Sequence, residues 1–226
     1  MPLLPWMGVM WWGMALILLG VALAAFAALG TDLIAALTST QVSLLATTQI
    51  GALTSTEIQN FTTTQANALS SRQLSGLSTT ALGNFSTTQI ASFSTTQVQS
   101  LSAVQLNGVS STQLDAFDST KLTGTQIVGL ITTTIGNLTA TQVDSLTSTQ
   151  VTQLTALQFG VLSSTEIQGF STTQANALTT RQLSGLSSTA LNNFSTTQIN
   201  AFSTTQLRSL SVAQLNAVSS DTLGAV

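Results

Sequence analysis

From residue 37 onward, large apolar residues recur in a pattern of eight. Each octad holds, at positions 1 to 8, a large apolar residue, Ser or Thr, two small polar residues, Gln, an aliphatic residue, a spacer and a small residue, as in residues 85–92, FSTTQIAS. The pattern keeps its register to Phe117, slips near Gly124 and runs again from Leu130 to the C-terminus. Self-similarity at a fixed short period predicts a repeat architecture.

The polar positions of each octad predict a short helix that begins at its Ser or Thr. Ser86 is a suitable N-cap, and Gln89 follows three residues later, which is the spacing of a capping box. Phe85 precedes the cap and Ile90 follows at the fourth helical position, the spacing of a hydrophobic staple. Each octad thus carries two signals for the start of a helix, a capping box and a hydrophobic staple.

The same pair of cap and glutamine recurs along the chain, at Ser94 and Gln97, Ser195 and Gln198, Thr38 and Gln41, Ser102 and Gln105, and Thr139 and Gln142. Glu57 and Glu166 replace the glutamine with the other residue that a capping box accepts, whereas Ala81 and Ala190 break the pattern in equivalent places. Each octad is therefore expected to be a helix of about one and a half turns, which the next Ser or Thr stops and restarts.

The predicted fold is mainly α, a solenoid of short capped helices in which octads stack on one another. One continuous helix is disfavoured because apolar spacings of 5 and 3 would spiral around a period of 3.6 residues. A β-solenoid is the alternative, since Thr favours strands, but the octads neither alternate with period two nor carry turn glycines at a fixed position. The small residues at position 8, Ser92, Ser100, Ala116 and Ala201, are expected where neighbouring helices approach closely.

Residues 1–30 are of another kind and predict a long hydrophobic helix, either transmembrane or at the core of a filament. No charge precedes Asp32, and residues 5–29 would span roughly 37 Å as a helix, enough to cross a bilayer. The predicted membrane or core contacts are the aromatic residues Trp6, Trp11 and Trp12 and the small residues Gly8, Gly13 and Gly20. A signal peptide that ends near residues 25–27, AFA, is the alternative, and the segment also resembles the N-terminal helix of type IV pilins.

The chain is expected to divide into the hydrophobic helix (1–30), a junction (31–36), a first solenoid block (37–117), an irregular insert (118–129) and a second block (130–226). Residues 53–116 recur at 162–225, offset by 109. Arg181 is therefore the equivalent of Arg72 in the second copy, and Glu166 is the equivalent of Glu57. The chain stops at Val226 without a polar capping repeat, which fits end-to-end association between copies and equally a frayed last octad in a monomer.

Composition leaves little chemistry available. Charged residues make up 5% of the chain, the net charge is −3, and His and Cys are absent, so we expect no nucleic-acid partner and no thiol or histidine catalysis. The carboxylates are Asp32, Glu57, Asp115, Asp118, Asp144, Glu166 and Asp221. None of them sits in a dense cation-binding loop, and the Asn-x-Ser/Thr strings at Asn60, Asn84, Asn137 and Asn193 follow from the repeat itself. We therefore predict no enzyme, no catalytic, cofactor or metal site and no small-molecule substrate.

The octads resemble the Thr/Gln-rich short-repeat tracts of large bacterial surface and adhesin-type proteins, over about 190 residues. The stretch LTSTQV at Leu37 is similar to the opening of TAL effector repeats, but the likeness covers helix-start chemistry alone and implies no DNA binding.

The sequence predicts a structural protein, an anchored repeat rod that assembles with its own copies into a filament, sheath or surface layer. Its expected partners are membrane lipid or a hydrophobic filament core and further copies of itself, at a bacterial membrane or cell surface. One alternative is a scaffold subunit of a membrane complex. Another is an ice- or carbohydrate-binding surface built on Thr ladders such as residues 54–56, which requires the β-solenoid.

Overall fold

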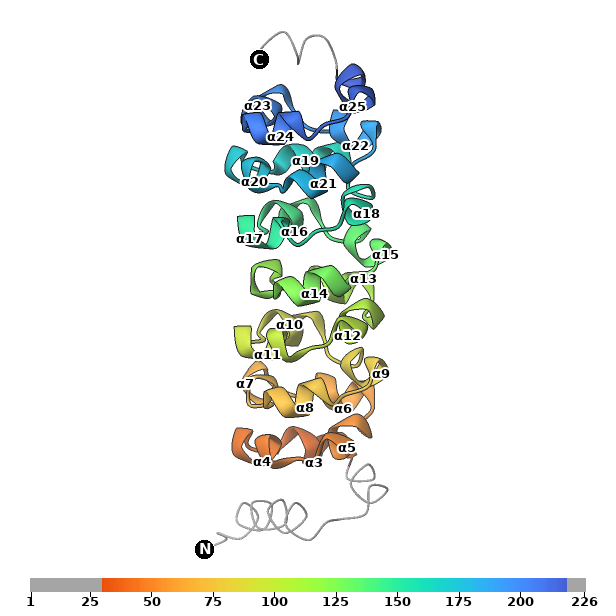
Figure 1. Ribbon diagram of the computed structural model, residues 1–226. Coiled ribbons are helices and arrows are strands. Elements are labelled where there is room, and N and C mark those ends of the chain that lie inside the picture. Colours follow the sequence, from red (N-terminus) through yellow and green to blue (C-terminus); the bar gives the residue numbers. More distant parts are fainter. Residues whose placement is uncertain (1–29, 219–226) are drawn as a thin grey trace, which may run out of the picture. The chain divides into compact units, whose positions relative to one another are not determined.

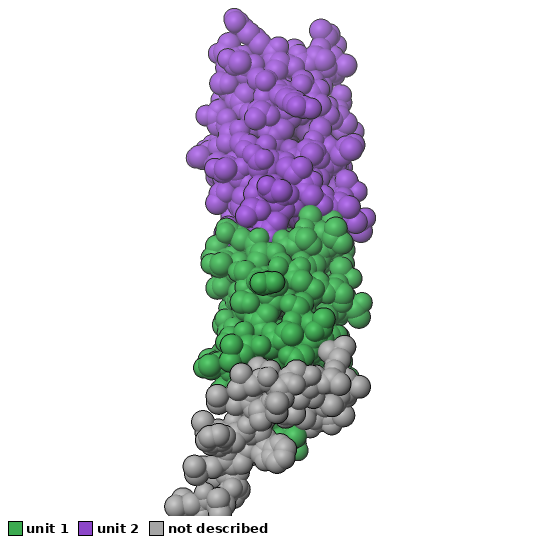
Figure 2. All heavy atoms as spheres, turned by 60° about the horizontal axis from the view of Figure 1, so that its bottom comes forward, with its two compact units in different colours: residues 1–117 green, residues 118–226 purple. Residues whose placement is uncertain are grey.

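The computed structural model describes residues 30–218 (Figure 1). These residues form α-helices of four to six residues and one 3-10 helix, and no strand occurs among them. The chain divides into two compact units, Met1–Phe117 and Asp118–Val226, which Figure 2 shows in green and purple. Each unit is a helical solenoid.

The described helices follow one another at the octad spacing. In unit 1 they are α3 (Gly30–Ala35), α4 (Ser39–Leu44), α5 (Thr47–Gly51), α6 (Ser55–Gln59), α7 (Thr63–Asn67), α8 (Ser71–Ser75), α9 (Thr79–Leu82), α10 (Thr87–Ala91), α11 (Thr95–Ser100), α12 (Ala103–Gly108) and α13 (Ser111–Asp115). In unit 2 they are η1 (Ser119–Lys121), α14 (Gly124–Gly129), α15 (Thr132–Gly136), α16 (Ala140–Asp144), α17 (Ser148–Val151), α18 (Ala156–Phe159), α19 (Ser164–Gly169), α20 (Thr172–Ala177), α21 (Thr180–Gly185), α22 (Ser188–Asn192), α23 (Thr196–Asn200), α24 (Thr204–Arg208) and α25 (Val212–Ala217).

Extended residues at positions 1 and 2 separate one helix from the next. Leu101, after α11, has φ −72° and ψ 139°, and Ser102, the N-cap of α12, has φ −76° and ψ 155°. An α-helix cannot continue through such values, so the chain changes direction before the Ser hydroxyl starts the next helix. The restart at every octad keeps each helix to one or two turns.

Within each unit, a helix packs on the helix three further along the chain. In unit 1 this relation joins α5 to α8 and α8 to α11, and in unit 2 it joins α16 to α19 and α17 to α20 (Figure 1). Buried glutamine side chains donate to carbonyl oxygens of the preceding turn that lie 28, 30 or 31 residues earlier. One turn of the solenoid therefore takes between three and four octads.

The core of each turn is filled from positions 1 and 6. Phe85 and Ile90 are each 1% exposed, and Phe93 is fully buried. The rings of Phe85 and Phe93 meet edge to face at 5.6 Å, and the duplicated pair Phe194 and Phe202 repeats this contact at 5.6 Å. The stacking of octads thus buries both apolar positions, which a single octad could not bury alone.

Small residues at position 8 lie where successive turns approach most closely. A Cβ atom at Gly76 would stand 2.9 Å from Thr47 Cγ2, and one at Gly108 would stand 2.6 Å from Thr79 Cγ2. Both distances are shorter than a normal carbon contact, so a larger residue at these two positions would push the turns apart.

The predicted fold class needs correction at its N-terminal end. No helix within residues 30–218 is both long enough and apolar enough to cross a membrane, and the first described helix, α3, has six residues and includes most of the predicted junction. The predicted long helix covers residues 1–30, and all of it except Gly30 lies outside the described residues, together with its candidate contacts, Trp6, Trp11, Trp12, Gly8, Gly13 and Gly20. The β-solenoid alternative is wrong, because the described chain is helical throughout, and the Thr-ladder hypothesis that depended on it is withdrawn.

The predicted irregular insert contains two ordered elements. Asp118 caps η1 through its side chain, which accepts the backbone N–H of Thr120, and α14 begins at Gly124 with a capping box between Thr123 and Gln126. The five extra residues are thus taken up before Leu122 by a 3-10 turn, and Gly124 is the first residue of a regular helix.

Candidate functional site: the glutamine bridges

The glutamine at position 5 closes the capping box of its own helix. In α10, Gln89 Oε1 accepts the Ser86 backbone N–H at 2.8 Å, and Ser86 Oγ accepts the Gln89 N–H at 3.3 Å. The predicted caps at Ser94 with Gln97 and at Ser195 with Gln198 have the same two bonds. Two backbone donors that a helix start leaves unpaired are thereby satisfied.

The amide nitrogen of the same glutamine joins two turns of the solenoid. Gln89 Nε2 donates to the carbonyl oxygens of Ile58 and Phe61, both at 2.7 Å. In unit 2, Gln198 Nε2 donates to Ile167 O and Phe170 O, both at 2.7 Å. The acceptors belong to positions 6 and 1 of the preceding turn, and position 1 is extended, so the helices themselves leave its carbonyl oxygen free to accept. We call this pair of bonds a glutamine bridge.

Glutamine bridges are buried. Gln89 and Gln198 are each 2% exposed and Gln97 is 3% exposed. In residues 30–218, no buried side-chain nitrogen or oxygen lacks a hydrogen-bond partner. A row of amides that would otherwise destabilise the core is therefore fully paired, and it fixes the register between turns.

Ala81 and Ala190 replace the glutamine in two octads that the duplication relates to each other. In unit 1, Asn84 takes over part of the bridge, since its Nδ2 donates to Leu53 O at 3.3 Å across 31 residues. In the described part of unit 2, the equivalent Asn193 forms no such bond to Leu162 O. The duplication thus supplies two nearly identical octads that differ in this one contact.

Asn84→Ala is expected to lower the free energy of unfolding by about 1 kcal/mol, because it leaves a buried carbonyl oxygen without its side-chain donor. Asn193→Ala is the matched control and is expected to change the same quantity by less than about 0.5 kcal/mol. Chemical denaturation followed by circular dichroism measures both. Equal losses in the two variants would contradict the assignment of Asn84 as a bridge.

Glu166 occupies a bridge position with a carboxylate. Its Oε2 accepts the backbone N–H of Ser163 at 2.6 Å and the Ser163 hydroxyl at 2.8 Å, so the capping function is kept. The carbonyl oxygens of Leu130 and Leu146, one octad before and one octad after Leu138, accept amides from Gln158 at 2.8 Å and Gln174 at 2.6 Å. An ionised carboxylate has no hydrogen to donate to the carbonyl oxygen of Leu138. The contact between Glu166 and the preceding turn therefore lacks the amide donor that Gln158 and Gln174 supply in the octads before and after it.

A second carboxylate lies at the same joint. Asp144 is at the end of α16, its carboxylate packs against Gly169 at the end of α19, and a Cβ atom at Gly169 would overlap it. Partial burial against α19, and then the nearby Glu166 carboxylate, raise the pKa of Asp144 above its ordinary value of 3.8. In unit 1 the equivalent helices α3 and α6 carry Ala35 and Asn60 in these places.

The remaining charged residues are dispersed. Within the described residues the recorded ion pair joins Lys121 Nζ to Asp118 at 3.9 Å, and neither Arg72 nor Arg181 pairs with a carboxylate. Glu57 closes a capping box with Thr54, and no group of three potential metal ligands occurs in residues 30–218. Asp32 and Asp115 are exposed, and Asp221 lies outside the described residues.

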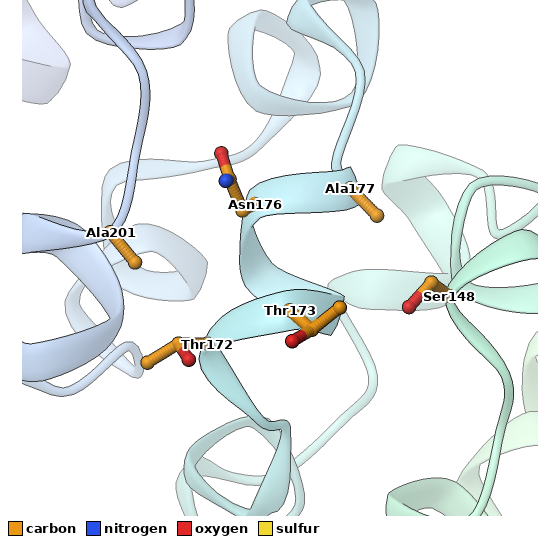
Figure 3. Close-up of a pocket in the computed structure, with 6 residues that line it drawn as sticks. All are labelled: Ser148, Thr172, Thr173, Asn176, Ala177 and Ala201. Atoms are coloured by element: carbon orange, nitrogen blue, oxygen red, sulfur yellow. The ribbon is translucent and has the colours of Figure 1, made fainter.

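A shallow hollow of about 540 Å³ lies on the outer surface of unit 2. Figure 3 shows its lining: Thr172, Thr173, Asn176 and Ala177 come from α20, Ser148 from α17, and Ala201 from the end of α23. Hydroxyl and amide groups can hydrogen-bond to a neutral surface, but the hollow holds no side chain that could act as an acid or base near neutral pH.

No family model, curated protein or solved structure matches this chain. The function is therefore argued from the geometry.

The bridge itself is the feature that sequence reasoning missed. The capping box explained the glutamine, but a capping box accepts Glu as readily as Gln. Glu stands at only two of the bridge positions, Glu57 and Glu166, and this preference for the amide was a signal that a donor was needed there. The partner carbonyls 28 and 31 residues away could not be found without the turn length.

Proposed function

We propose that the protein is a structural repeat protein that assembles with copies of itself. The observation that supports this best is the use of its polar groups. The buried glutamines join one turn to the next, and the exposed positions carry mainly uncharged small residues. This arrangement suits a scaffold rather than a catalyst.

The surface favours association between copies. In each unit one stack of helices, α4, α7 and α10 in unit 1 and α17, α20 and α23 in unit 2, contains no charged residue. We call the pairs at positions 3 and 4 of these helices the hydroxyl faces; they are Ser39, Thr40, Thr63, Thr64, Thr87 and Thr88 in unit 1, and Ser148, Thr149, Thr172, Thr173, Thr196 and Thr197 in unit 2. A net charge of −3 on 226 residues gives little long-range repulsion between copies.

Exposed apolar side chains add to this tendency. Leu157 is 77% exposed and Val104 is 72% exposed. Covering such side chains with a neighbouring copy lowers the free energy, and the few surface charges give little repulsion against that contact.

Sedimentation velocity and electron microscopy of the full chain test the proposal. We expect species larger than the monomer that grow with protein concentration and show a regular repeat in images. A variant with Glu at the second residue of each hydroxyl-face pair (40, 64, 88, 149, 173 and 197) should stay monomeric at low salt with an unchanged helical spectrum, whereas Ser at the same positions should assemble normally. A native chain that sediments as a monomer at every concentration would overturn the proposal.

A further inference from the structure

The first described turn holds two glutamines whose amide nitrogens bind nothing within the described chain. Gln41 Oε1 and Gln49 Oε1 each accept a backbone N–H at 2.8 Å, so both serve the start of their own helix. No described carbonyl oxygen accepts from Gln41 Nε2 or Gln49 Nε2, whereas the bridges of later glutamines reach 28 and 31 residues back. The same reach from these two glutamines ends within residues 1–29, which contain no Ser, Thr or Gln and therefore no octad.

The two side chains are otherwise enclosed. Gln41 is 7% exposed and Gln49 is 9% exposed. Every buried side-chain nitrogen in residues 30–218 has a partner, so the two unpaired nitrogens lie where these side chains reach the surface. An amide that its own helix already holds in place is a preorganised donor, and binding a carbonyl oxygen from another molecule orders it little further.

The last described turn has the matching acceptors. The carbonyl oxygens of Phe202 and Leu210, at position 1 after α23 and α24, accept no hydrogen bond within the described residues. One turn earlier the same position is occupied, since Leu178 O accepts from Gln206 Nε2 at 2.7 Å. The sequence contains no glutamine after Gln214, so no later octad of this sequence supplies an amide to these two carbonyl groups.

The same turn leaves part of the apolar core uncovered. The residues at position 6 are buried in every described octad from Val42 to Ile199. The next two residues at this position, Leu207 in α24 and Leu215 in α25, are only half-buried. A further turn of octads would bury both side chains and would bring amides to the free carbonyl groups, which lowers the free energy in two ways.

The charges of the two turns are opposite in sign. The helices at the start of the described chain, α3 to α6, carry Asp32 and Glu57 and no base. The helices at its end, α23 to α25, carry Arg208 and no acid. Two surfaces of opposite charge attract each other, whereas two copies of the same surface repel. The charges therefore favour contact between the first turn of one copy and the last turn of another.

We propose that copies of this chain join head to tail through glutamine bridges between molecules. Gln41 Nε2 of one copy donates to Phe202 O of the next, and Gln49 Nε2 donates to Leu210 O. The two pairs keep the order seen within unit 2, where consecutive glutamines donate to consecutive position-1 carbonyl groups. The inference rests on the proposed self-assembly and adds the surfaces that carry it.

The contact is heterologous, because a donor surface meets a different, acceptor surface. Each copy that binds leaves one free surface of each kind, so growth does not stop at a dimer. Two hydrogen bonds and two half-buried leucines make a small contact, so this surface extends assemblies that the hydroxyl faces also hold together.

The full chain with Gln41→Glu and Gln49→Glu tests the proposal. Glutamate keeps the capping box, as Glu57 does with Thr54, but an ionised carboxylate has no hydrogen to donate. No bridge within the described chain is lost, so the helical spectrum and the unfolding midpoint of the monomer should not change. Light scattering should show that the concentration at which large species appear rises roughly 30-fold, the effect of two lost hydrogen bonds.

Ser43→Glu with Gly51→Glu is the matched control. It adds the same two charges to exposed positions of the same helices, α4 and α5, and leaves both amides in place. The concentration at which large species appear should rise less than about 3-fold, because salt screens exposed charges.

A mixing experiment tests the direction of the contact. The Gln41→Glu, Gln49→Glu chain keeps its acceptor surface, so it should bind to a growing assembly and then stop growth there. A minor fraction of this chain added to the native chain should therefore reduce the mean size of the assemblies, and the control chain should not.

The outcomes separate this inference from the proposed function. If the native chain and the Gln41→Glu, Gln49→Glu chain assemble at the same concentration, the head-to-tail contact is wrong and self-assembly stands. A less stable monomer of that variant would also overturn the inference, because the two amides would then act within one chain. A native chain that stays monomeric at every concentration would overturn the proposed function and this contact with it.

Discussion

Replacing Gln97 with Glu is expected to lower the free energy of unfolding by about 3 kcal/mol, although the two side chains have the same shape. Gln97 is 3% exposed, and its Nε2 donates to Ala66 O at 3.0 Å and to Leu69 O at 2.9 Å. A carboxylate keeps the capping box with Ser94 but turns two buried donor contacts into repulsion between oxygens. The substitution therefore isolates the bridge from the cap.

The control is Thr96→Glu, which adds the same charge one residue earlier on an exposed part of α11. It is expected to change the free energy of unfolding by less than about 0.5 kcal/mol. Urea denaturation at pH 7.5 measures both variants. If the two substitutions lowered the free energy of unfolding equally, the loss would come from the added negative charge alone, and the bridge of Gln97 would contribute nothing to stability.

Replacing Phe93 with Ala is expected to lower the free energy of unfolding by about 4 kcal/mol. Phe93 is fully buried at position 1 and packs edge to face on Phe85. Its truncation removes that ring contact and leaves a cavity that the short neighbouring helices cannot fill without losing their bridges.

Val104→Ala is the matched control, because Val104 is a large apolar residue that is 72% exposed. Its loss is expected to stay below about 0.5 kcal/mol. Thermal and urea unfolding followed at 222 nm measure the difference between the two. A small cost at Phe93 would mean that the octads do not share a close-packed core.

The local structure follows from the sequence because its signals are local. The N-cap, the glutamine three residues after it and the hydrophobic staple all lie within one octad. Ser86, Gln89 and Ile90 therefore suffice to predict α10 and its capping box. The apolar positions 1 and 6 also predict the core, since each octad presents them in the same way.

What joins the octads could not be derived in this way. The bridge of Gln89 reaches Ile58 and Phe61, and the number of octads in one turn depends on how three or four helices close around the core. Asn84 and Asp144 are similar cases, because each acts on a residue 25 to 31 positions away that only the turn length brings near. The position of a residue within its octad predicts whether its side chain is buried, but not which residue of the neighbouring turn it contacts.

The turn length is the central claim, and a cross-link between turns measures it most directly. A Cβ atom added at Gly185 would lie 3.0 Å from the Ala156 Cβ, 29 residues earlier, where α18 packs on α21. The native sequence contains no cysteine, so two introduced thiols can pair only with each other. The double variant Ala156→Cys with Gly185→Cys should form a disulfide on mild oxidation of the folded chain, because small shifts bring the pair to disulfide geometry. Ala156→Cys with Ala177→Cys, which places the second thiol one octad too early, should not. Cross-linking of the control pair in place of the first would contradict a turn of between three and four octads.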